Sequence, residues 1–116
     1  MVKIAPSILA ANLLDLKNEV LKVDRAGVEY IHIDIMDGHY VPNISFGSNI
    51  VRELRLHTSK ILDVHLMINT VSKFVKNFID AGADIVSFHP ETESSPDKII
   101  NIIKNSECKC GIAIHP

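Results

Sequence analysis

Two spacings of apolar residues alternate along the chain. Short apolar runs rich in β-branched residues predict strands, at residues 3–9, 30–36, 61–67, 84–88 and 110–114. Between these runs, apolar residues recur three and four positions apart, which predicts helices, at residues 12–26, 48–57, 70–81 and 96–104. The helix over 70–81 is the clearest, because its apolar residues form one stripe at amphipathic spacing.

Residues that start and stop helices stand at the expected ends. Asn12 is suited to cap the first helix, and Asp15 three residues later makes a weak capping box. Gly27 and Gly82 follow two predicted helices and suit the left-handed position after a last turn. Pro96 favours the first turn of the last helix, where its missing N–H is no loss.

Strict alternation of strand and helix predicts a parallel sheet with helices packed on it. The strands recur about every 26 residues, so eight such units need roughly 210 residues, close to the usual (β/α)8 barrel. The chain holds a little over half of that length. A doubly wound open sheet of five strands would fit the length as it is, so length favours the open sheet. The sequence motifs are needed to choose between the open sheet and the barrel.

Composition excludes several classes of protein. With 47% hydrophobic and 22% charged residues among 116, the chain is neither disordered, collagen-like nor coiled coil. A formal net charge of -2 shows no excess of basic residues of the kind that binds nucleic acid or an anionic membrane. No apolar run reaches the roughly 18 residues of a membrane span. Cys108 and Cys110 are too close for an unstrained disulfide, so a reducing cytoplasm is expected.

Polar side chains share one face of three successive predicted strands. Alternation along a strand places every second residue on the same face. The members lie toward the carboxyl ends of the strands, where α/β folds place their sites: His32, Asp34, Asp63, His65, Ser87 and His89. Because parallel strands are normally apolar on both faces, these residues indicate a site.

His32, Asp34 and His65 are the strongest candidates. A lone histidine on a strand is more often a hydrogen-bonded core residue, but burying two imidazoles and a carboxylate together is costly without a cation or a network. Two imidazoles and one carboxylate with open positions suit a divalent metal, and the pattern does not distinguish Zn, Fe, Mn or Co. Asp63 either orients a ligand imidazole or is a satisfied strand carboxylate.

Other polar residues are less informative. Ser7 either joins the polar face or bonds to backbone, and Glu91 is a candidate to hold a loop. Met36 and Met67 end the two predicted strands that carry the candidate metal ligands. They would line the mouth of a pocket there, but they are interpreted as core residues. Three histidines are predicted to be isolated: His39, His57 and His115. There is no Gly-rich phosphate loop among the 116 residues.

Five runs resemble the ribulose-phosphate 3-epimerase family. They extend from the first predicted strand to the fifth and so cover essentially the whole chain, at residues 5–11, 32–43, 44–47, 63–67 and 89–91. The run over 32–43, His-Ile-Asp-Ile-Met-Asp-Gly-His-Tyr-Val-Pro-Asn, is the most specific.

The resemblance implies a (β/α)8 TIM barrel of the α/β class, of which residues 1–116 would be the N-terminal portion of a single domain, about four and a half units. It implies an isomerase of the pentose phosphate pathway that converts D-ribulose 5-phosphate to D-xylulose 5-phosphate at C3. His32, Asp34 and His65 would bind one divalent cation, Asp34 would also accept the proton, and Ser7 and His65 would contact the substrate. A cytoplasmic homo-oligomer is expected.

The implied chemistry suits these residues. Epimerisation next to a carbonyl passes through an enediolate and needs a base on one face and an acid on the other. A divalent cation would stabilise the developing charge and keep Asp34 ionised.

Three features depart from the family. Asn12 stands where the family often has Asp, and His115 where it often has Asn. The family's second catalytic Asp and its Gly-rich phosphate loops have no counterpart among these residues, so the sequence resembles the N-terminal half of the enzyme. Two alternatives stay open: an allulose-6-phosphate 3-epimerase, and a non-catalytic half-barrel that binds a metal or a partner.

Overall fold

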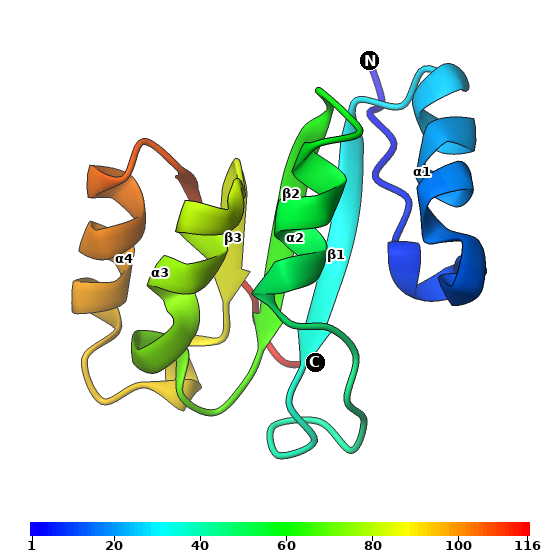
Figure 1. Cartoon of the computed structure of the whole chain (residues 1–116). Helices are drawn as coiled ribbons and strands as arrows, with labels where there is room; N and C mark the ends of the chain where they lie inside the picture. The colour runs from blue at the N-terminus through cyan, green and yellow to red at the C-terminus, as the bar shows by residue number, and fades with distance from the viewer.

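The computed structural model describes all 116 residues and contains one parallel sheet in the order β1-β2-β3-β4. Its strands are β1 (Tyr30–Met36), β2 (Ile61–Met67), β3 (Ile85–Phe88) and β4 (Lys109–Ile112). A helix precedes each strand, as Figure 1 shows: α1 (Leu16–Arg25), α2 (Ser48–Arg55), α3 (Val71–Ala81) and α4 (Pro96–Asn105). The predicted α/β class and the predicted helices and strands from residue 16 onward are therefore confirmed, with ends shifted by a few residues.

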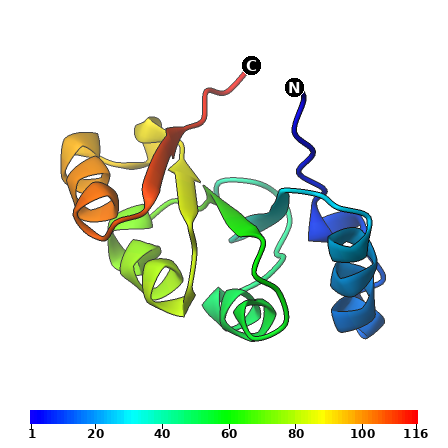
Figure 2. The same ribbon diagram turned by 90° about the horizontal axis from the view of Figure 1, so that it is seen from above.

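The sheet is curved and its helices lie on one side. Seen from above, the strands follow an arc, the helices lie along its outer side, and both ends of the chain project on the inner side (Figure 2). A doubly wound sheet carries helices on both faces, so that alternative is wrong. The chain has a partial α/β fold, consistent with one part of a (β/α)8 barrel.

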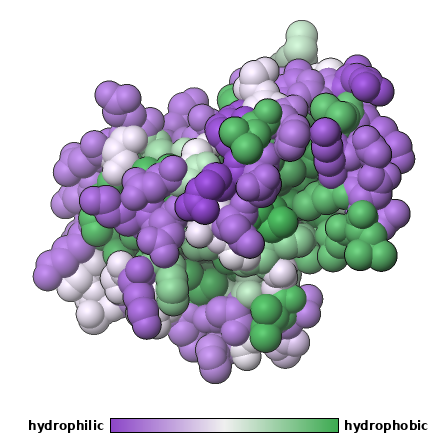
Figure 3. Space-filling model, in the orientation of Figure 1, coloured by the Kyte–Doolittle hydropathy of each residue, from purple (hydrophilic) through white to green (hydrophobic).

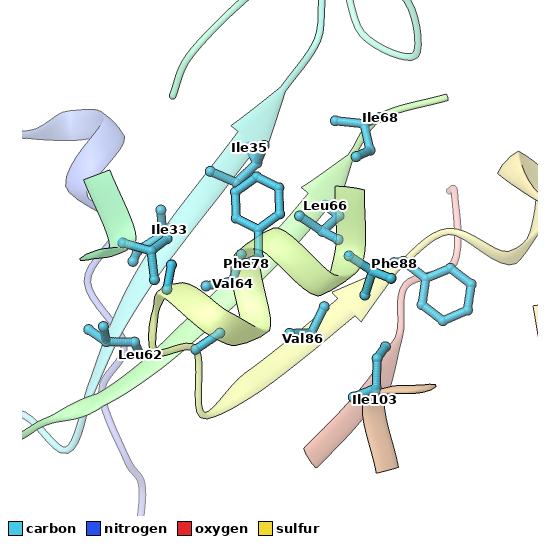
Figure 4. Close-up of a cluster of buried hydrophobic side chains, with 14 of the residues drawn as sticks. Ile33, Ile35, Leu62, Val64, Leu66, Ile68, Phe78, Val86, Phe88 and Ile103 are labelled. Atoms are coloured by element: carbon cyan, nitrogen blue, oxygen red, sulfur yellow. The ribbon is translucent and has the colours of Figure 1, made fainter. Parts of the chain in front are cut away.

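The core lies between the sheet and the helices. Alternate residues of β1 and β2 point to the helices and are buried, as their burial patterns show. Figure 4 shows these strand side chains gathered with Phe78 of α3 and Ile103 of α4. The opposite face of the same strands carries the half-buried polar residues, so core packing fixes the direction in which the candidate site points.

The predicted first strand is wrong. Residues 3–9 form no strand, and the segment meets β1 through a single parallel bridge between Ser7 and His32. The backbone N–H of His32 donates to the carbonyl of Pro6 at 2.9 Å. Proline has no N–H for a ladder, and the Ser7 hydroxyl then caps a short 3-10 helix, η1 (Ile8–Ala10), which ends the extended segment.

The first helix begins in two steps. Asn12 is a cap, as predicted, but it caps a 3-10 turn, η2 (Leu13–Asp15), that precedes α1. The predicted box with Asp15 is wrong, because the Asn12 N–H donates to the Glu19 carboxylate at 3.3 Å. Asp15 accepts a hydrogen bond from Asn18 instead. The 3-10 turn moves the fourth residue of a regular capping box out of reach.

Arg55, the last residue of α2, joins several backbone segments at the amino-terminal end of the sheet. The amino-terminal ends of β1 and β2 lie at the top of Figure 1. The Arg55 guanidinium donates to the carbonyls of Thr58, Lys60 and Gly82, at 2.7, 2.7 and 3.3 Å, and to the Asp84 carboxylate at 2.8 Å. Gly82 has a φ of 117°, and a Cβ there would lie 2.8 Å from Arg55 Cδ. Only glycine allows both the turn and this close approach.

Polar residues cover most of the helix-bearing face, with scattered apolar patches (Figure 3). Leu14, just before α1, is fully exposed, and Leu13 beside it is half exposed. No helix is both long enough and apolar enough to cross a membrane.

Candidate metal centre

The sheet register brings the three candidate ligands together. Asp34 of β1 lies opposite His65 of β2, and His32 lies two residues before Asp34 on the same face. One potential ligand atom from each of the three residues lies within 4.8 Å of the others. The group sits on the inner face of the sheet, toward the carboxyl ends of the strands, where parallel α/β folds place their sites.

Asp34 is the centre of this group. Its Oδ1 lies 3.1 Å from His32 Nε2 and 3.3 Å from His65 Nδ1, and its Oδ2 accepts a hydrogen bond from the Ser7 hydroxyl at 2.6 Å. Burial alone would raise the pKa of Asp34, but the Ser7 hydrogen bond and the two histidines outweigh burial and lower it. Asp34 is therefore a carboxylate at neutral pH.

Asp63 contacts the ring nitrogen of His32 that does not face Asp34. His32 Nδ1 lies 2.8 Å from the Asp63 carboxylate, and this leaves Nε2 facing Asp34. The hydrogen bond to Asp63 raises the pKa of His32 despite the opposing effect of burial. Of the two interpretations of Asp63, the contact fits the one that orients a ligand imidazole.

A second polar cluster extends from His65. His65 Nε2 lies 2.9 Å from Nε2 of His89, which is only 7% exposed and follows β3. The other ring nitrogen of His89 is buried without a hydrogen-bond partner, 3.6 Å from the Glu91 carboxylate. Burial lowers the pKa of His89, and the neighbouring His65 lowers it further.

Tyr40 completes this second cluster. Its hydroxyl donates to Glu91 at 2.5 Å, and its ring centroid lies 4.7 Å from that of His89. Burial and the hydrogen bond to Glu91 raise the pKa of Tyr40 to about 12. His115 was predicted to be isolated, which is wrong: its ring lies 6.3 Å from Tyr40 and 6.4 Å from His89. His39 and His57 are exposed.

Sequence reasoning placed His89 on the polar face but gave it no role. The available signal was its position two residues after Ser87, with Glu91 two residues further. Ser45 lay within the run over 44–47 that resembles the family but was given no role of its own: its hydroxyl donates to the Asp34 carbonyl at 2.5 Å and accepts from the Met36 N–H at 2.9 Å. No spacing rule marks Ser45, because it reaches β1 from a loop.

A loop over residues 37–47 borders the site. Asp37 accepts backbone N–H bonds from His39 and Tyr40 in this loop, at 2.8 and 2.9 Å, and from Asn69 after β2 at 2.8 Å. Burial alone would raise the pKa of Asp37, but the three hydrogen bonds outweigh burial and lower it. One carboxylate thus joins the loop after β1 to the loop after β2.

Met36 and Met67 differ in burial, and the hollow near one of them is separate from the ligand group. Met67 is buried, as the core interpretation predicted, while Met36 is half-buried and its sulfur lies 3.7 Å from Asn43 Nδ2. A hollow of about 350 Å³ is lined by Phe46, Phe74 and Phe78 among others, and does not include the ligand residues. The ligand group instead lies on the open inner face of the sheet.

The donor set fits a divalent cation. With metal–ligand bonds of about 2.0–2.1 Å, tetrahedral ligand atoms lie roughly 3.3 Å apart. The contacts of Asp34 Oδ1 with the two imidazoles, at 3.1 and 3.3 Å, are close to this spacing. Two nitrogens and one carboxylate oxygen suit Zn, Fe, Mn or Co.

A family model and individual relatives of known name both match this chain, and they agree on one family. The sequence model described as the Ribulose-phosphate 3 epimerase family matches residues 3–116. A protein named ribulose-phosphate 3-epimerase from Bacillus subtilis (strain 168) is 45% identical over 116 residues, which are 100% of this chain and 54% of the relative. Proteins of the same name from Rhodobacter capsulatus and Escherichia coli (strain K12) are 38% and 40% identical over 99% and 97% of this chain, and 50% and 51% of their own lengths. The chain spans about half the length of the curated relatives it matches.

Proposed function

This chain belongs to the ribulose-phosphate 3-epimerase family, and from that premise we propose that it serves the epimerisation of D-ribulose 5-phosphate to D-xylulose 5-phosphate at C3. The observation that supports this most is the convergence of His32, Asp34 and His65 on the open face of the sheet. A base held beside two imidazoles suits removal of a proton next to a carbonyl.

Asp34 is the proposed base. It is ionised at neutral pH, half-buried and held at Oδ2 by the Ser7 hydroxyl. In the proposed step the C3–H bond breaks, the proton moves to the Asp34 carboxylate, and the electron pair enters the enediolate of the substrate. Return of a proton to the opposite face of C3 completes the epimerisation. Ser7 and His65, both half-buried beside Asp34, are proposed to contact the substrate.

His32, Asp34 and His65 are proposed to hold one divalent cation. When bound, such a cation acts as a Lewis acid that stabilises negative charge on the substrate oxygens. His32 is held for this task by its 2.8 Å contact with Asp63. Ser7 keeps the Asp34 carboxylate in place, so that the ligand group is oriented before anything binds.

Residues 1–116 are proposed to form the N-terminal portion of a single (β/α)8 barrel domain. The curved sheet with helices on its outer side only supports this, as does the coverage of about half of each relative. The acid for the opposite face of C3 and a phosphate-binding loop have no candidate among residues 1–116, so the complete catalytic unit must supply both. A cytoplasmic location and homo-oligomer formation remain predictions.

A hybrid enzyme tests the proposal. Residues 1–116 replace the matching half of the Bacillus subtilis relative, and turnover of ribulose 5-phosphate and of allulose 6-phosphate is measured, with the unaltered relative as control. We expect turnover of ribulose 5-phosphate in the presence of a divalent cation. Preference for allulose 6-phosphate would favour the sister epimerase. A folded hybrid that turns over neither sugar would favour a non-catalytic half-barrel.

A further inference from the structure

The two candidate ligand histidines are held by different kinds of group. His32 Nδ1 faces the Asp63 carboxylate at 2.8 Å, whereas His65 Nε2 faces His89 Nε2 at 2.9 Å. A carboxylate only accepts, so Asp63 requires the hydrogen of His32 to be on Nδ1. A neutral imidazole either donates or accepts, so the pair of His65 and His89 has two possible arrangements.

The two arrangements have opposite consequences for the ligand group. If His65 donates from Nε2, its Nδ1 keeps a free lone pair, 3.3 Å from Asp34 Oδ1, and His89 carries its hydrogen on Nδ1. If His89 donates instead, His65 carries its hydrogen on Nδ1, directed at Asp34. That hydrogen occupies the position that a cation needs. The choice of tautomer therefore decides whether His65 is a ligand.

Glu91 favours the first arrangement. Its Oε1 lies 3.6 Å from His89 Nδ1, which is buried and has no other partner. A carboxylate at that distance attracts an N–H and repels a lone pair. Asp34 Oδ1, 3.3 Å from His65 Nδ1, attracts a hydrogen to that nitrogen in the same way, and a cation held by Asp34 and His65 would remove this attraction. Glu91 would then decide the tautomer in the cation-loaded chain. Tyr40 holds both Glu91 and His89 in place, because its hydroxyl donates to the same Glu91 oxygen at 2.5 Å and its ring packs on the ring of His89.

We propose that His89 and Glu91 are positioning residues that select the tautomer of His65 and leave its Nδ1 free to bind a cation. The proposal rests on the proposed cation site of His32, Asp34 and His65, and adds a chain of contacts that lies outside this ligand group. Contacts of this kind to a ligand histidine commonly change metal affinity without touching the metal.

Zn²⁺ binding to the 116-residue chain measures the first consequence. Glu91→Gln replaces the carboxylate with an amide that can donate to His89 Nδ1, and we expect the affinity for Zn²⁺ to fall about tenfold. Tyr40→Phe keeps the ring but frees Glu91, so a smaller fall is expected. Glu53→Gln makes the same change of charge on an exposed site of α2 and is the matched control. Circular dichroism of each variant checks that the fold is unchanged.

Nitrogen-15 NMR of the histidine rings measures the tautomers directly, which a merely structural role would not alter. In the Zn²⁺-loaded chain we expect hydrogen on Nε2 of His65 and on Nδ1 of His89, with the His89 signal shifted toward the other tautomer in Glu91→Gln. Hydrogen on Nε2 of His89 in the loaded chain would overturn the proposal. If the unaltered chain binds no Zn²⁺, the cation site and the proposal both fail. If the chain binds Zn²⁺ and Glu91→Gln binds it equally well, only the role of His89 and Glu91 fails.

Discussion

The two ends of the sheet each carry a cluster of polar residues, and the two clusters differ in how far their hydrogen-bonding groups are paired. At the amino-terminal end, Arg55 is always charged and gives four hydrogen bonds to three carbonyls and a carboxylate. At the carboxyl-terminal end, two imidazoles share one oxygen of Asp34, and His89 has a buried nitrogen without a partner. At the amino-terminal end, the hydrogen-bonding groups around Arg55 are paired with one another. At the carboxyl-terminal end, ring nitrogens and a carboxylate oxygen stay available to bind a ligand. The difference agrees with the division of (β/α)8 barrels into a stabilising end and a reactive end.

The largest effect at the carboxyl-terminal end is expected from a change at Asp34. In the hybrid enzyme, Asp34→Asn removes the proposed base and is expected to slow exchange of the C3 hydrogen with solvent by roughly 10²–10⁴-fold. Proton NMR in deuterated water follows the exchange. Asp80→Asn, the same change on the exposed side of α3, is the control. Exchange at the unaltered rate would exclude Asp34 as the base.

Arg55 tests the opposite end. Arg55→Met removes its charge-assisted hydrogen bonds and leaves partly buried carbonyls unpaired, which is expected to lower the free energy of unfolding by about 3 kcal/mol. Urea unfolding measures the change, and Arg52→Met on the exposed side of α2 is expected to stay within about 0.5 kcal/mol. Zn²⁺ affinity of the folded Arg55 variant should not change. A variant of unaltered stability would show that the hydrogen bonds of Arg55 do not stabilise the amino-terminal end of the sheet.

Asp63 belongs to the carboxyl-terminal cluster but contacts a proposed ligand, His32, without being a ligand itself. Asp63→Asn keeps the size of the side chain but weakens the hold on His32, so Zn²⁺ affinity is expected to fall roughly tenfold. Competition with a chromophoric chelator gives the affinity, and Asp80→Asn again matches the chemical change. Unaltered affinity would make Asp63 a strand carboxylate with no part in the site.

The smallest expected effect is the pH dependence of the metal-free chain. The pKa of His32 is raised by Asp63, so the folded state holds the proton more tightly than the unfolded state. This contribution to stability is complete below the unfolded pKa of about 6.5 and is lost as pH rises through the folded pKa. Urea unfolding at several pH values should show the loss, and Asp63→Asn should flatten it. His57→Asn, at an exposed histidine, should leave the profile as it is.

The periodicity of the sequence predicted the parts of the fold that depend on local pattern. The bounds of β1 and β2 match the prediction, and α3 begins at Val71, because alternating and helical spacing are direct consequences of backbone geometry. The segment over 3–9 failed, because it lies beside β1 with only one bridge and Pro6 cannot donate to a ladder. An apolar run alone does not tell a paired strand from an extended segment.

The candidate site was predictable in part for the same reason. Alternation placed His32, Asp34 and His65 on one face, and parallel pairing brought β1 and β2 together. The contact of His65 with His89, and the hydrogen bond of Ser45 to β1, depend on ring orientation and on the path of a loop. Neither leaves a repeat in the sequence, so the structure was needed to find them.

The three N–H bonds to Asp37 also have a consequence for motion. Two of these bonds, from His39 and Tyr40, hold Asp37 within its own loop, and the third, from Asn69, joins that loop to the loop after β2. Separation of the two loops therefore requires the Asn69 bond to break. If the loop after β1 carries Asp37 away when it opens, the Asn69 amide hydrogen should exchange with solvent at least as fast as those of His39 and Tyr40. The Asn69 amide is thus a local reporter of the moment at which the two loops that border the proposed site separate.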